Sequence, residues 1–377
     1  MYLEKNNSNT IQKITIKTIA KKLSKNTNEK MDFMSGNLHC SRHKFQKTQM
    51  MTKKNLLILL VLLSSIIPVS ARITLSEKFY KNVTIDENPD KKITGKDPFS
   101  DDFVTEFSIK NGLIYVNANL NGKVRSFLLD SGLGTNLILN SDAKFVENLT
   151  GTDICINGMG SGKCREVETS WINTFNWKGI KLSNTEVTAM SLSHLGQGDG
   201  FAGIIGFNTF KNYQLTFDFQ HGILKADTKK NIEKEVKENG KLISTIPFEL
   251  KDHMPVFEVE INGKKYKMGL DTGASVNVMN NKYLSDFSDS VSNIREVSMK
   301  GFGGKSTVQR GSIKETKIGG LNYDNMDYNF DNSSLNSLNK EYKYGIDGII
   351  GYEFLKKYIT VVDFKSKEIR IYDGVII

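Results

Sequence analysis

The sequence predicts an all-β fold with few short helices, arranged as two halves that share one plan. Most of the chain after residue 104 alternates apolar and polar residues with a period of two, as in YVNANLNG and VFEVEING, which is typical of strands. Asn-Gly pairs at 121–122 and 262–263 interrupt these runs, and this dipeptide favours tight hairpin turns. The third observation is an internal repeat, which predicts that the two halves fold alike.

The repeat relates residues 107–140 to residues 248–280. The Asn-Gly pairs align at an offset of 141 residues, and Asp130 aligns with Asp271 at the same offset. A later block, GIIGFNTFKNYQLTFDF at 203–219, matches GIIGYEFLKKYITVVDF at 348–364. Each half therefore contains, in order, a strand, an Asn-Gly turn, a strand ending in Asp-Ser/Thr-Gly, a glycine-rich hairpin, and an apolar pair followed by glycine.

Helical patterns are scarce. The segment SDAKFVENLTG (141–151) predicts one short helix, with Ser141 capping its start and Gly151 ending it. GFNTFKNY and GYEFLKKY predict short helical turns in the two halves. The charged, apolar-poor stretch 228–244 is interpreted as a linker. It separates a first lobe, residues 104–227, from a second lobe, residues 245–377.

The net charge of +9 lies almost entirely at the N-terminal end. Residues 1–50 carry 10 basic and 3 acidic residues, and Lys53 and Lys54 follow, which leaves 39 basic and 39 acidic residues from 72 onward. A neutral body lacks the basic surface that nucleic-acid binding requires. We therefore expect no nucleic-acid partner.

The stretch MTKKNLLILLVLLSSIIPVSA (51–71) predicts a signal peptide. It has a basic start, an aliphatic core, and small residues Ser70 and Ala71 where a peptidase would cut. The core is short for a membrane span, which needs about 20 residues. We expect a periplasmic or secreted protein without a stable membrane span after cleavage. A signal anchor with a basic cytoplasmic tail is the alternative.

Two N-terminal segments lie outside the predicted lobes. Residues 1–50 are polar and rich in Lys and Asn, and we expect either a disordered extension or a translation start at Met50 or Met51 that excludes them. Residues 72–103 carry mixed charge without a clear period, and are interpreted as an N-terminal arm or a removable pro-segment.

Two cysteines, Cys155 and Cys164, follow the predicted signal peptide and flank the glycine-rich stretch INGMGSGK. If Met159-Gly160 forms the tip of a hairpin, the two cysteines face each other across its strands, and a disulfide becomes geometrically plausible. Two free thiols are the alternative, because pairing does not follow from sequence alone.

The ordered motifs resemble the aspartic peptidase clan of retropepsins and pepsins, and each half resembles a bacterial retropepsin-like domain. The resemblance covers roughly residues 104–375 and rests on two copies of Asp-Ser/Thr-Gly, each followed by a glycine-rich hairpin and by apolar-apolar-Gly. It implies two closed β-barrel lobes in one chain, forming a pseudo-dimer that needs no second copy. We therefore expect an exported aspartic endopeptidase that acts as a monomer on peptides or proteins, without cofactor or metal.

The resemblance also implies roles for individual residues. Asp130 and Asp271 would form a dyad that shares one proton, because two adjacent carboxylates cannot both ionise. One carboxyl would activate a water molecule and the other would protonate the carbonyl oxygen. The remaining implied positions support the active-site loops (Ser131, Gly132, Thr272, Gly273, Gly206 and Gly351) or form flaps over the substrate (Gly158, Met159, Gly160, Gly301, Phe302 and Gly303).

The sequence departs from the family pattern directly after both motifs. Many pepsins have a hydroxyl residue that helps acidify the dyad, whereas this chain has Leu133 and Ala274 there. Apolar neighbours should raise the pKa values of the dyad, which predicts activity nearer mildly acidic or neutral pH than strongly acidic pH. The halves also differ one residue further on, where Gly134 aligns with Ser275. The two flaps are therefore not expected to contribute equally.

Two other functions fit the same sequence. A non-cleaving relative would keep the cleft and bind peptides, and a duplicated β-barrel of structural role would carry the Asp motifs by coincidence. Asp218 and Asp363 lie inside predicted strands and are interpreted as structural. His194, His221 and His253 show no spacing to cysteine or glutamate pairs that would favour a metal site.

Overall fold

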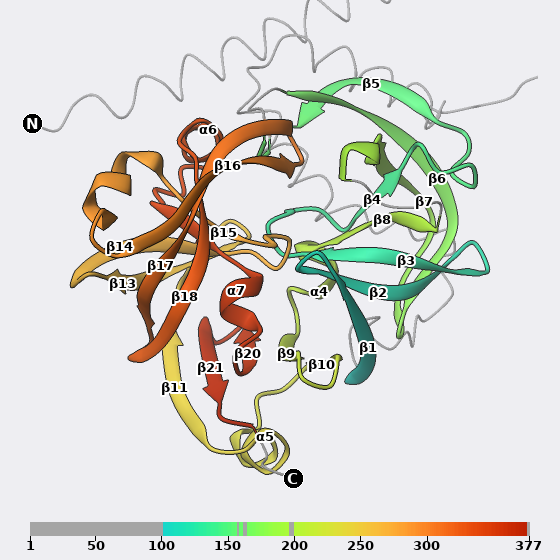
Figure 1. Cartoon of the computed structure of the whole chain (residues 1–377). Helices are drawn as coiled ribbons and strands as arrows, with labels where there is room; N and C mark the ends of the chain where they lie inside the picture. Colours follow the sequence, from blue (N-terminus) through green and yellow to red (C-terminus); the bar gives the residue numbers. More distant parts are fainter. Residues whose placement is uncertain (1–100, 157, 161–163, 196–199, 375–377) are drawn as a thin grey trace, which may run out of the picture. The chain divides into compact units, whose positions relative to one another are not determined.

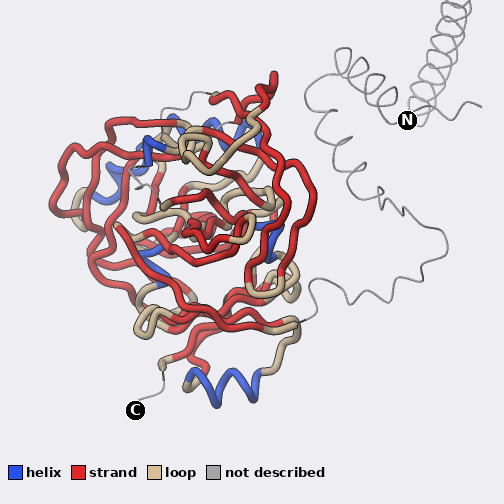
Figure 2. The backbone as a smooth tube through the Cα atoms, turned by 90° about the vertical axis from the view of Figure 1, so that its right-hand side faces the viewer, coloured by secondary structure: helices blue, strands red, loops and turns tan. Residues whose placement is uncertain are grey.

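Two closed β-barrels account for most of the described residues in the computed structural model (Figure 1). The structure describes residues 101–156, 158–160, 164–195 and 200–374, all within the compact unit Ile93–Ile377. Strand dominates the backbone and the helices are short (Figure 2). The predicted all-β fold with closed barrels is confirmed.

The first barrel has six strands that pair in a closed circle. In their order around the barrel they are β2 (Leu113–Leu120), β3 (Lys123–Asp130), β8 (Phe201–Gly206), β4 (Leu137–Asn140), β7 (Ile180–Met190) and β6 (Arg165–Trp177). The circle closes where Asn119 and Leu120 of β2 pair with Asn176 and Phe175 of β6. An outer strand, β5 (Thr150–Ile156), pairs with the far end of β6 and forms the first hairpin with it.

The second barrel repeats this pairing order. Its strands are β13 (Met254–Ile261), β14 (Lys264–Leu270), β19 (Gly348–Ile350), β15 (Asn277–Met279), β18 (Leu321–Phe330) and β17 (Gly304–Ile318). The circle closes where Glu260 pairs with Lys317. The outer strand β16 (Val291–Gly301) forms the second hairpin with β17, and β12 (Glu249–Lys251) pairs with the start of β13.

A six-stranded antiparallel sheet joins the two barrels. Its order is β1 (Phe103–Lys110), β10 (Ile223–Asp227), β9 (Gln214–Asp218), β20 (Ile359–Asp363), β21 (Glu368–Tyr372) and β11 (Leu242–Pro247). The repeated blocks TFDF and VVDF meet in this sheet, because β9 and β20 pair directly, with Thr216 opposite Val361. The repeat therefore places equivalent strands of the two halves side by side.

The local sequence explains the hairpins that lead into β3 and β14, the strands that reach Asp130 and Asp271. Asn121-Gly122 joins β2 to β3 and Asn262-Gly263 joins β13 to β14, and all four residues have positive φ, between 50° and 84°. Two consecutive residues with positive φ form the turn that matches the twist of paired strands, and Asn-Gly adopts it most readily. Each turn sets the register of the strand that ends at an aspartate.

The helices of the described residues are α4 (Phe207–Phe210), α5 (Ile232–Asn239), α6 (Ser333–Tyr342) and α7 (Tyr352–Leu355), with 3-10 helices η1 (Ser193–Leu195) and η2 (Asn281–Phe287). The predicted helical turns after Gly206 and Gly351 are confirmed as α4 and α7. Among the described residues, none of the helices has the length and apolar character needed to cross a bilayer.

The predicted helix at 141–151 is wrong. The chain forms turns there, and β5 begins at Thr150. The Asn140 side chain accepts hydrogen bonds from the backbone N–H groups of Asp142 and Leu192, and Asp142 accepts one from Ser193. These bonds hold the segment against the loop after β7, so tertiary contacts replace the helical hydrogen bonds.

The stretch interpreted as a linker is an ordered part of the fold. Its helix α5 begins at Asn231, whose side chain accepts a hydrogen bond from Lys234 N–H. Glu235 of α5 is buried and pairs with the guanidinium of Arg370 in β21 at 2.8 Å. A buried ion pair of this kind fixes the helix against the sheet that joins the barrels. The proposed signal peptide at 51–71, the segment 1–50 and most of the arm 72–103 lie outside the described residues.

Candidate active site

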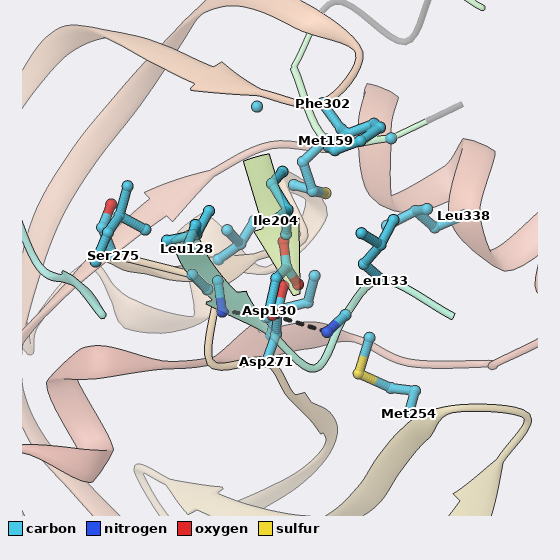
Figure 3. Close-up of a pocket in the computed structure, with 18 of the residues that line it drawn as sticks. Leu128, Asp130, Leu133, Met159, Ile204, Met254, Asp271, Ser275, Phe302 and Leu338 are labelled. Atoms are coloured by element: carbon cyan, nitrogen blue, oxygen red, sulfur yellow. Dashed lines mark hydrogen bonds between the residues drawn. The ribbon is translucent and has the colours of Figure 1, made fainter. Parts of the chain in front are cut away.

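Asp130 and Asp271 lie together between the two barrels, each at the end of an equivalent strand (Figure 3). Asp130 ends β3, which runs parallel to β8 with Asp130 opposite Gly206. Asp271 follows β14, which runs parallel to β19, and its N–H donates to the carbonyl of Ile350 at 2.9 Å. The structure therefore brings the two repeated motifs to one point.

The hydroxyls that follow the aspartates connect the two loops. Ser131 N–H donates to Thr272 Oγ1 at 2.9 Å, and Thr272 N–H donates to Ser131 Oγ at 3.0 Å. The Thr272 hydroxyl also donates to the carbonyl of Leu129 at 3.1 Å. Both side chains are buried, with exposed fractions of 1% and 2%. Because hydrogen bonds are strongest where water is excluded, this reciprocal pair holds the loops in a fixed relation.

Each motif glycine faces the carboxyl group of the opposite loop. A Cβ atom on Gly132 would lie 2.6 Å from the carboxyl carbon of Asp271, and one on Gly273 would lie 2.5 Å from that of Asp130. Real Cβ contacts do not approach so closely, so only glycine fits both positions. The N–H groups of Gly132 and Gly273 both donate to Asp271 Oδ1, at 3.1 and 2.7 Å.

Gly206 and Gly351 lie directly beneath the loops. A Cβ atom on Gly206 would clash with the carbonyls of Thr135 and Leu133, and one on Gly351 would clash with Ala274. The backbone of each loop therefore rests on a glycine from the parallel strand of its own barrel.

The two aspartates differ in their hydrogen bonding. Asp271 accepts two backbone N–H groups, whereas Oδ1 of Asp130 is buried and accepts no hydrogen bond from the described residues. Burial, followed by the charge of Asp271, raises the pKa of Asp130 well above its usual range, although backbone donors of Gly132 and Leu133 oppose this rise. Burial also raises the pKa of Asp271, but donors that include Gly273, Asp130 and Gly132 oppose this rise. If the two carboxyls share one proton, the protonated form is therefore more stable on Asp130 and the ionised form on Asp271.

The cleft around the dyad is mainly apolar. Leu128, Leu133 and Ile204 line it from the first barrel, and Met254 and Leu338 from the second (Figure 3). Apolar walls with a few convergent polar groups are typical of ligand sites. Low polarity around the carboxyls is also the physical reason why burial dominates their pKa values.

The two glycine-rich hairpins meet over this cleft. The N–H of Gly303 donates to the carbonyl of Met159 at 2.7 Å, so the tips contact each other. Met159, from the first hairpin, packs against an apolar cluster of the second barrel that includes Met254 and Leu338. Phe302, from the second hairpin, packs against the first barrel's cluster around Leu128 and Ile204. Each tip therefore covers the opposite barrel.

Polar contacts hold each tip in place. Gly160 N–H donates to Ser334 Oγ at 3.0 Å, and the Ser334 hydroxyl donates to the Gly160 carbonyl at 2.7 Å. His194 Nε2 donates to the carbonyl of Gly301 at 2.8 Å. Burial, and next the charge of Arg165, lowers the pKa of His194, which favours its neutral form.

Gly158 completes the first tip, where a Cβ atom would lie 2.5 Å from Cβ of Phe302. Cys155 and Cys164 form a disulfide at the base of this hairpin, with their Cα atoms 5.5 Å apart. The segment 161–163, which connects the tip to Cys164, lies outside the described residues. The second hairpin has no cysteine among its residues 291–318.

The remaining candidate residues lie away from the dyad. Asp363 pairs with the buried Arg370 at 3.3 Å, and Asp218 pairs with His221 at 2.7 Å. Both aspartates therefore hold the joining sheet. Within the described part of the chain, no three His, Cys, Asp or Glu side chains gather in a way that could hold a metal ion.

His253 is the site residue that sequence reasoning missed. It is buried, lines the cleft, and places Nε2 2.8 Å from the carbonyl oxygen of Gly132. At the offset of 141, His253 corresponds to Gly112, just as Gly134 corresponds to Ser275. In the structure His253 packs against Gly134, and the equivalent residues Gly112 and Ser275 pack against each other. A comparison of the two halves at these positions could therefore have indicated the contact, because both residues of the pair differ between the halves.

Comparison with known proteins agrees with this geometry. Residues 257–357 match the family described as gag-polyprotein putative aspartyl protease. The matched stretch contains Asp271, Thr272, Gly273 and the second hairpin, but neither Asp130 nor His253. No curated protein matches the chain. The chain thus contains an aspartic peptidase-like region within a mostly β fold.

Proposed function

We propose that this protein is an aspartic endopeptidase that hydrolyses peptide bonds with the Asp130/Asp271 dyad. The observation that carries the proposal is the pair of buried carboxyls, supplied by equivalent loops and connected by the hydroxyls of Ser131 and Thr272. Burial raises the pKa of both carboxyls, and ionisable groups with strongly shifted pKa values in a cleft are typical of catalytic sites.

The asymmetry of the dyad assigns a role to each carboxyl. Asp271, whose charge is supported by two N–H groups, takes a proton from a water molecule as the general base. Asp130, which holds the shared proton, gives it to the carbonyl oxygen as water attacks the carbonyl carbon. The resulting tetrahedral intermediate is neutral. As its C–N bond breaks, Asp271 gives its proton to the leaving nitrogen and Asp130 takes a hydroxyl proton from the intermediate, which restores the starting protonation of the dyad. No cofactor enters this scheme.

The hairpins would bind an extended peptide. The tips at 158–160 and 301–303 offer backbone groups to a strand-like substrate, which is the usual mode of strand addition. Because the tips contact each other and the barrels, they must separate to admit a substrate.

Two observations support export, which is part of the proposal. The stretch 51–71 has the pattern of a signal peptide, and Cys155 is bonded to Cys164, as is usual for proteins in an oxidising compartment. We propose a periplasmic or secreted monomer. Mass spectrometry of the mature N-terminus would test this part, since an uncut segment 51–71 would favour the signal-anchored alternative.

The test of activity compares the full chain with its Asp271→Asn variant on denatured casein and a peptide library across about pH 3–8. We expect cleavage by the unchanged protein, inhibition by pepstatin, and a loss of at least about 1,000-fold in Asp271→Asn with the fold intact. The raised pKa values predict a maximum at mildly acidic to neutral pH. Peptide binding without cleavage at any pH would favour the non-cleaving relative.

A further inference from the structure

His253 has a set of contacts that the proposed dyad chemistry does not use. Its Nε2 lies 2.8 Å from Gly132 O, and its Nδ1 lies 3.1 Å from Asp252 Oδ2. A carbonyl oxygen and a carboxylate oxygen can only accept hydrogen bonds. Both contacts are therefore hydrogen bonds only when both ring nitrogens carry protons, which is the imidazolium form.

The surroundings suit a positive charge in this place. The His253 side chain is 7% exposed, and the carboxylate of Asp252 beside it is 55% exposed. The rings of Tyr342 and Tyr344 stand edge-on to the imidazole, with centroids at 5.8 and 5.7 Å, and the Tyr344 hydroxyl lies 3.0 Å from Nε2. A buried charge needs such partners, and here it has a carboxylate and a hydroxyl.

The imidazole reaches the dyad through the backbone of the first active-site loop. The residue whose carbonyl receives Nε2–H, Gly132, is the same residue whose N–H donates to Asp271 Oδ1 at 3.1 Å. The charge of His253 is among the influences that oppose the rise in the pKa of Asp271. Because Asp252 is half in solvent, water screens its charge more than it screens the buried imidazolium.

The chain makes room for this contact at Gly134. A Cβ atom on residue 134 would lie 2.6 Å from Nδ1 of His253, so a side chain there would displace the ring. In the other half, Gly112 stands where His253 would be, and Ser275 stands where Gly134 would be. In each half one residue of the contacting pair is a glycine, which leaves room for the side chain of the other. The loop that carries Asp271 therefore has no imidazole at the equivalent place.

We propose, on the basis of the proposed peptidase function, that His253 is a positioning residue for the dyad. As an imidazolium it fixes the carbonyl of Gly132 and favours the ionised carboxylate on Asp271, so that the shared proton rests on Asp130. The ionisable groups around it are Asp252, Asp130, Asp271, Tyr342 and Tyr344, with Glu341 beside the tyrosines and Lys251 donating to the Tyr344 carbonyl. The test changes the two carboxylates on which the inference depends, Asp252 and Asp271.

The kinetic test uses His253→Gln, which keeps an N–H donor for Gly132 but removes the charge. Without the charge, ionised Asp271 is less stable, so the acidic limb of the pH profile of kcat/KM should move to higher pH by roughly half a unit or more. We expect kcat to fall about 10-fold with KM within about twofold, since the apolar residues that line the cleft are unchanged and Gln is similar in size to His. Asp252→Asn should move the limb in the same direction by less, and Gly134→Ala should reproduce His253→Gln by displacing the ring.

The matched control is His221→Gln, since His221 also pairs with an aspartate but lies in the turn between β9 and β10 of the joining sheet. It should leave the profile unchanged. An acidic limb that stays within about 0.2 units in folded His253→Gln would overturn the inference, because a merely structural histidine would not set the dyad's titration.

A second measurement does not depend on activity. In protein labelled with ¹³C at the aspartate carboxyls, the resonance that Asp271→Asn removes belongs to Asp271. We expect this carboxyl to titrate at higher pH in His253→Gln than in the unchanged protein, and an unchanged titration would reject the inference. If the carboxyl shifts but no peptide is cleaved, the peptidase proposal fails alone. If peptides are cleaved without the shift, the role of His253 fails alone.

Discussion

The two active-site loops share a backbone plan but lie in different surroundings. After Asp130 the chain continues Ser131-Gly132-Leu133-Gly134, and the imidazole of His253 packs on this loop from the other half. After Asp271 it continues Thr272-Gly273-Ala274-Ser275, and at the position equivalent to His253 the glycine Gly112 packs on this loop at Ser275.

The difference between the loops teaches how a repeated fold can make two chemically unequal carboxyls. Symmetry of the barrels brings the aspartates together, but it would give both the same affinity for a proton. Unequal surroundings remove this equality. Oδ1 of Asp271 receives two N–H groups, whereas Oδ1 of Asp130 receives none from the described residues. Backbone donors of Gly132 and Leu133 also act on Asp130, but its pKa is raised well above the usual range all the same. Distinct acid and base roles follow from this inequality.

The largest effect on stability is expected at the reciprocal hydrogen bonds between Ser131 and Thr272, which connect the two active-site loops. Thr272→Ala leaves two buried groups without partners, Ser131 N–H and Leu129 C=O, whereas Ser131→Ala leaves only Thr272 N–H. We expect losses in the free energy of unfolding of about 3 kcal/mol and about 2 kcal/mol, respectively. Denaturant titration measures both, and Thr272→Ser is the control because it keeps the hydroxyl. Equal losses would contradict the unequal bonding of the two loops.

The hairpins offer a second comparison, since only the first carries a disulfide. Replacing both Cys155 and Cys164 by serine opens a short loop, with a sequence separation of 9, and should cost about 2 kcal/mol or less. Amide hydrogen exchange should quicken around the first tip more than around residues 301–303. Residues 301–303 are the internal control, because the second hairpin has no cysteine among its residues 291–318. Equal quickening in both hairpins would show that the tips move as one unit.

The smallest expected effect separates the two carboxyls thermodynamically. Because burial raises the folded-state pKa of Asp130, its protonated form favours folding, and this stability is present at low pH and lost as the pH rises through that pKa. Asparagine stays neutral at every pH, so Asp130→Asn does not lose this stability as the pH rises. The variant should be more stable than the unchanged protein by about 1 kcal/mol near neutral pH. Asp271→Asn should gain less, because its pKa is raised less far.

Thermal unfolding of both variants near pH 4 and pH 7 measures this difference. The gain from Asp130→Asn should shrink at the lower pH, where the unchanged carboxyl is already protonated. A larger gain from Asp271→Asn would reverse the assignment of acid and base.

The sequence by itself determined the plan of the molecule. Alternation of apolar residues and the Asn-Gly turns predicted the strands, because side-chain period and turn conformation are local properties. The repeat predicted that Asp130 and Asp271 would occupy equivalent positions, and the glycines at 206 and 351 followed from the same alignment.

Tertiary structure decided what local patterns do not encode. The segment 141–151 has a helical pattern, but hydrogen bonds from Asn140 and Asp142 to the chain after β7 hold it in turns. The charged stretch at 228–244 contains α5, which is held against the joining sheet by the buried ion pair between Glu235 and Arg370, a residue distant in sequence. His253 gave no motif, since its partners are a backbone carbonyl 121 residues away and an adjacent aspartate. Such contacts depend on distances in space, which sequence spacing does not fix, and they are what make the two halves of this dyad unequal.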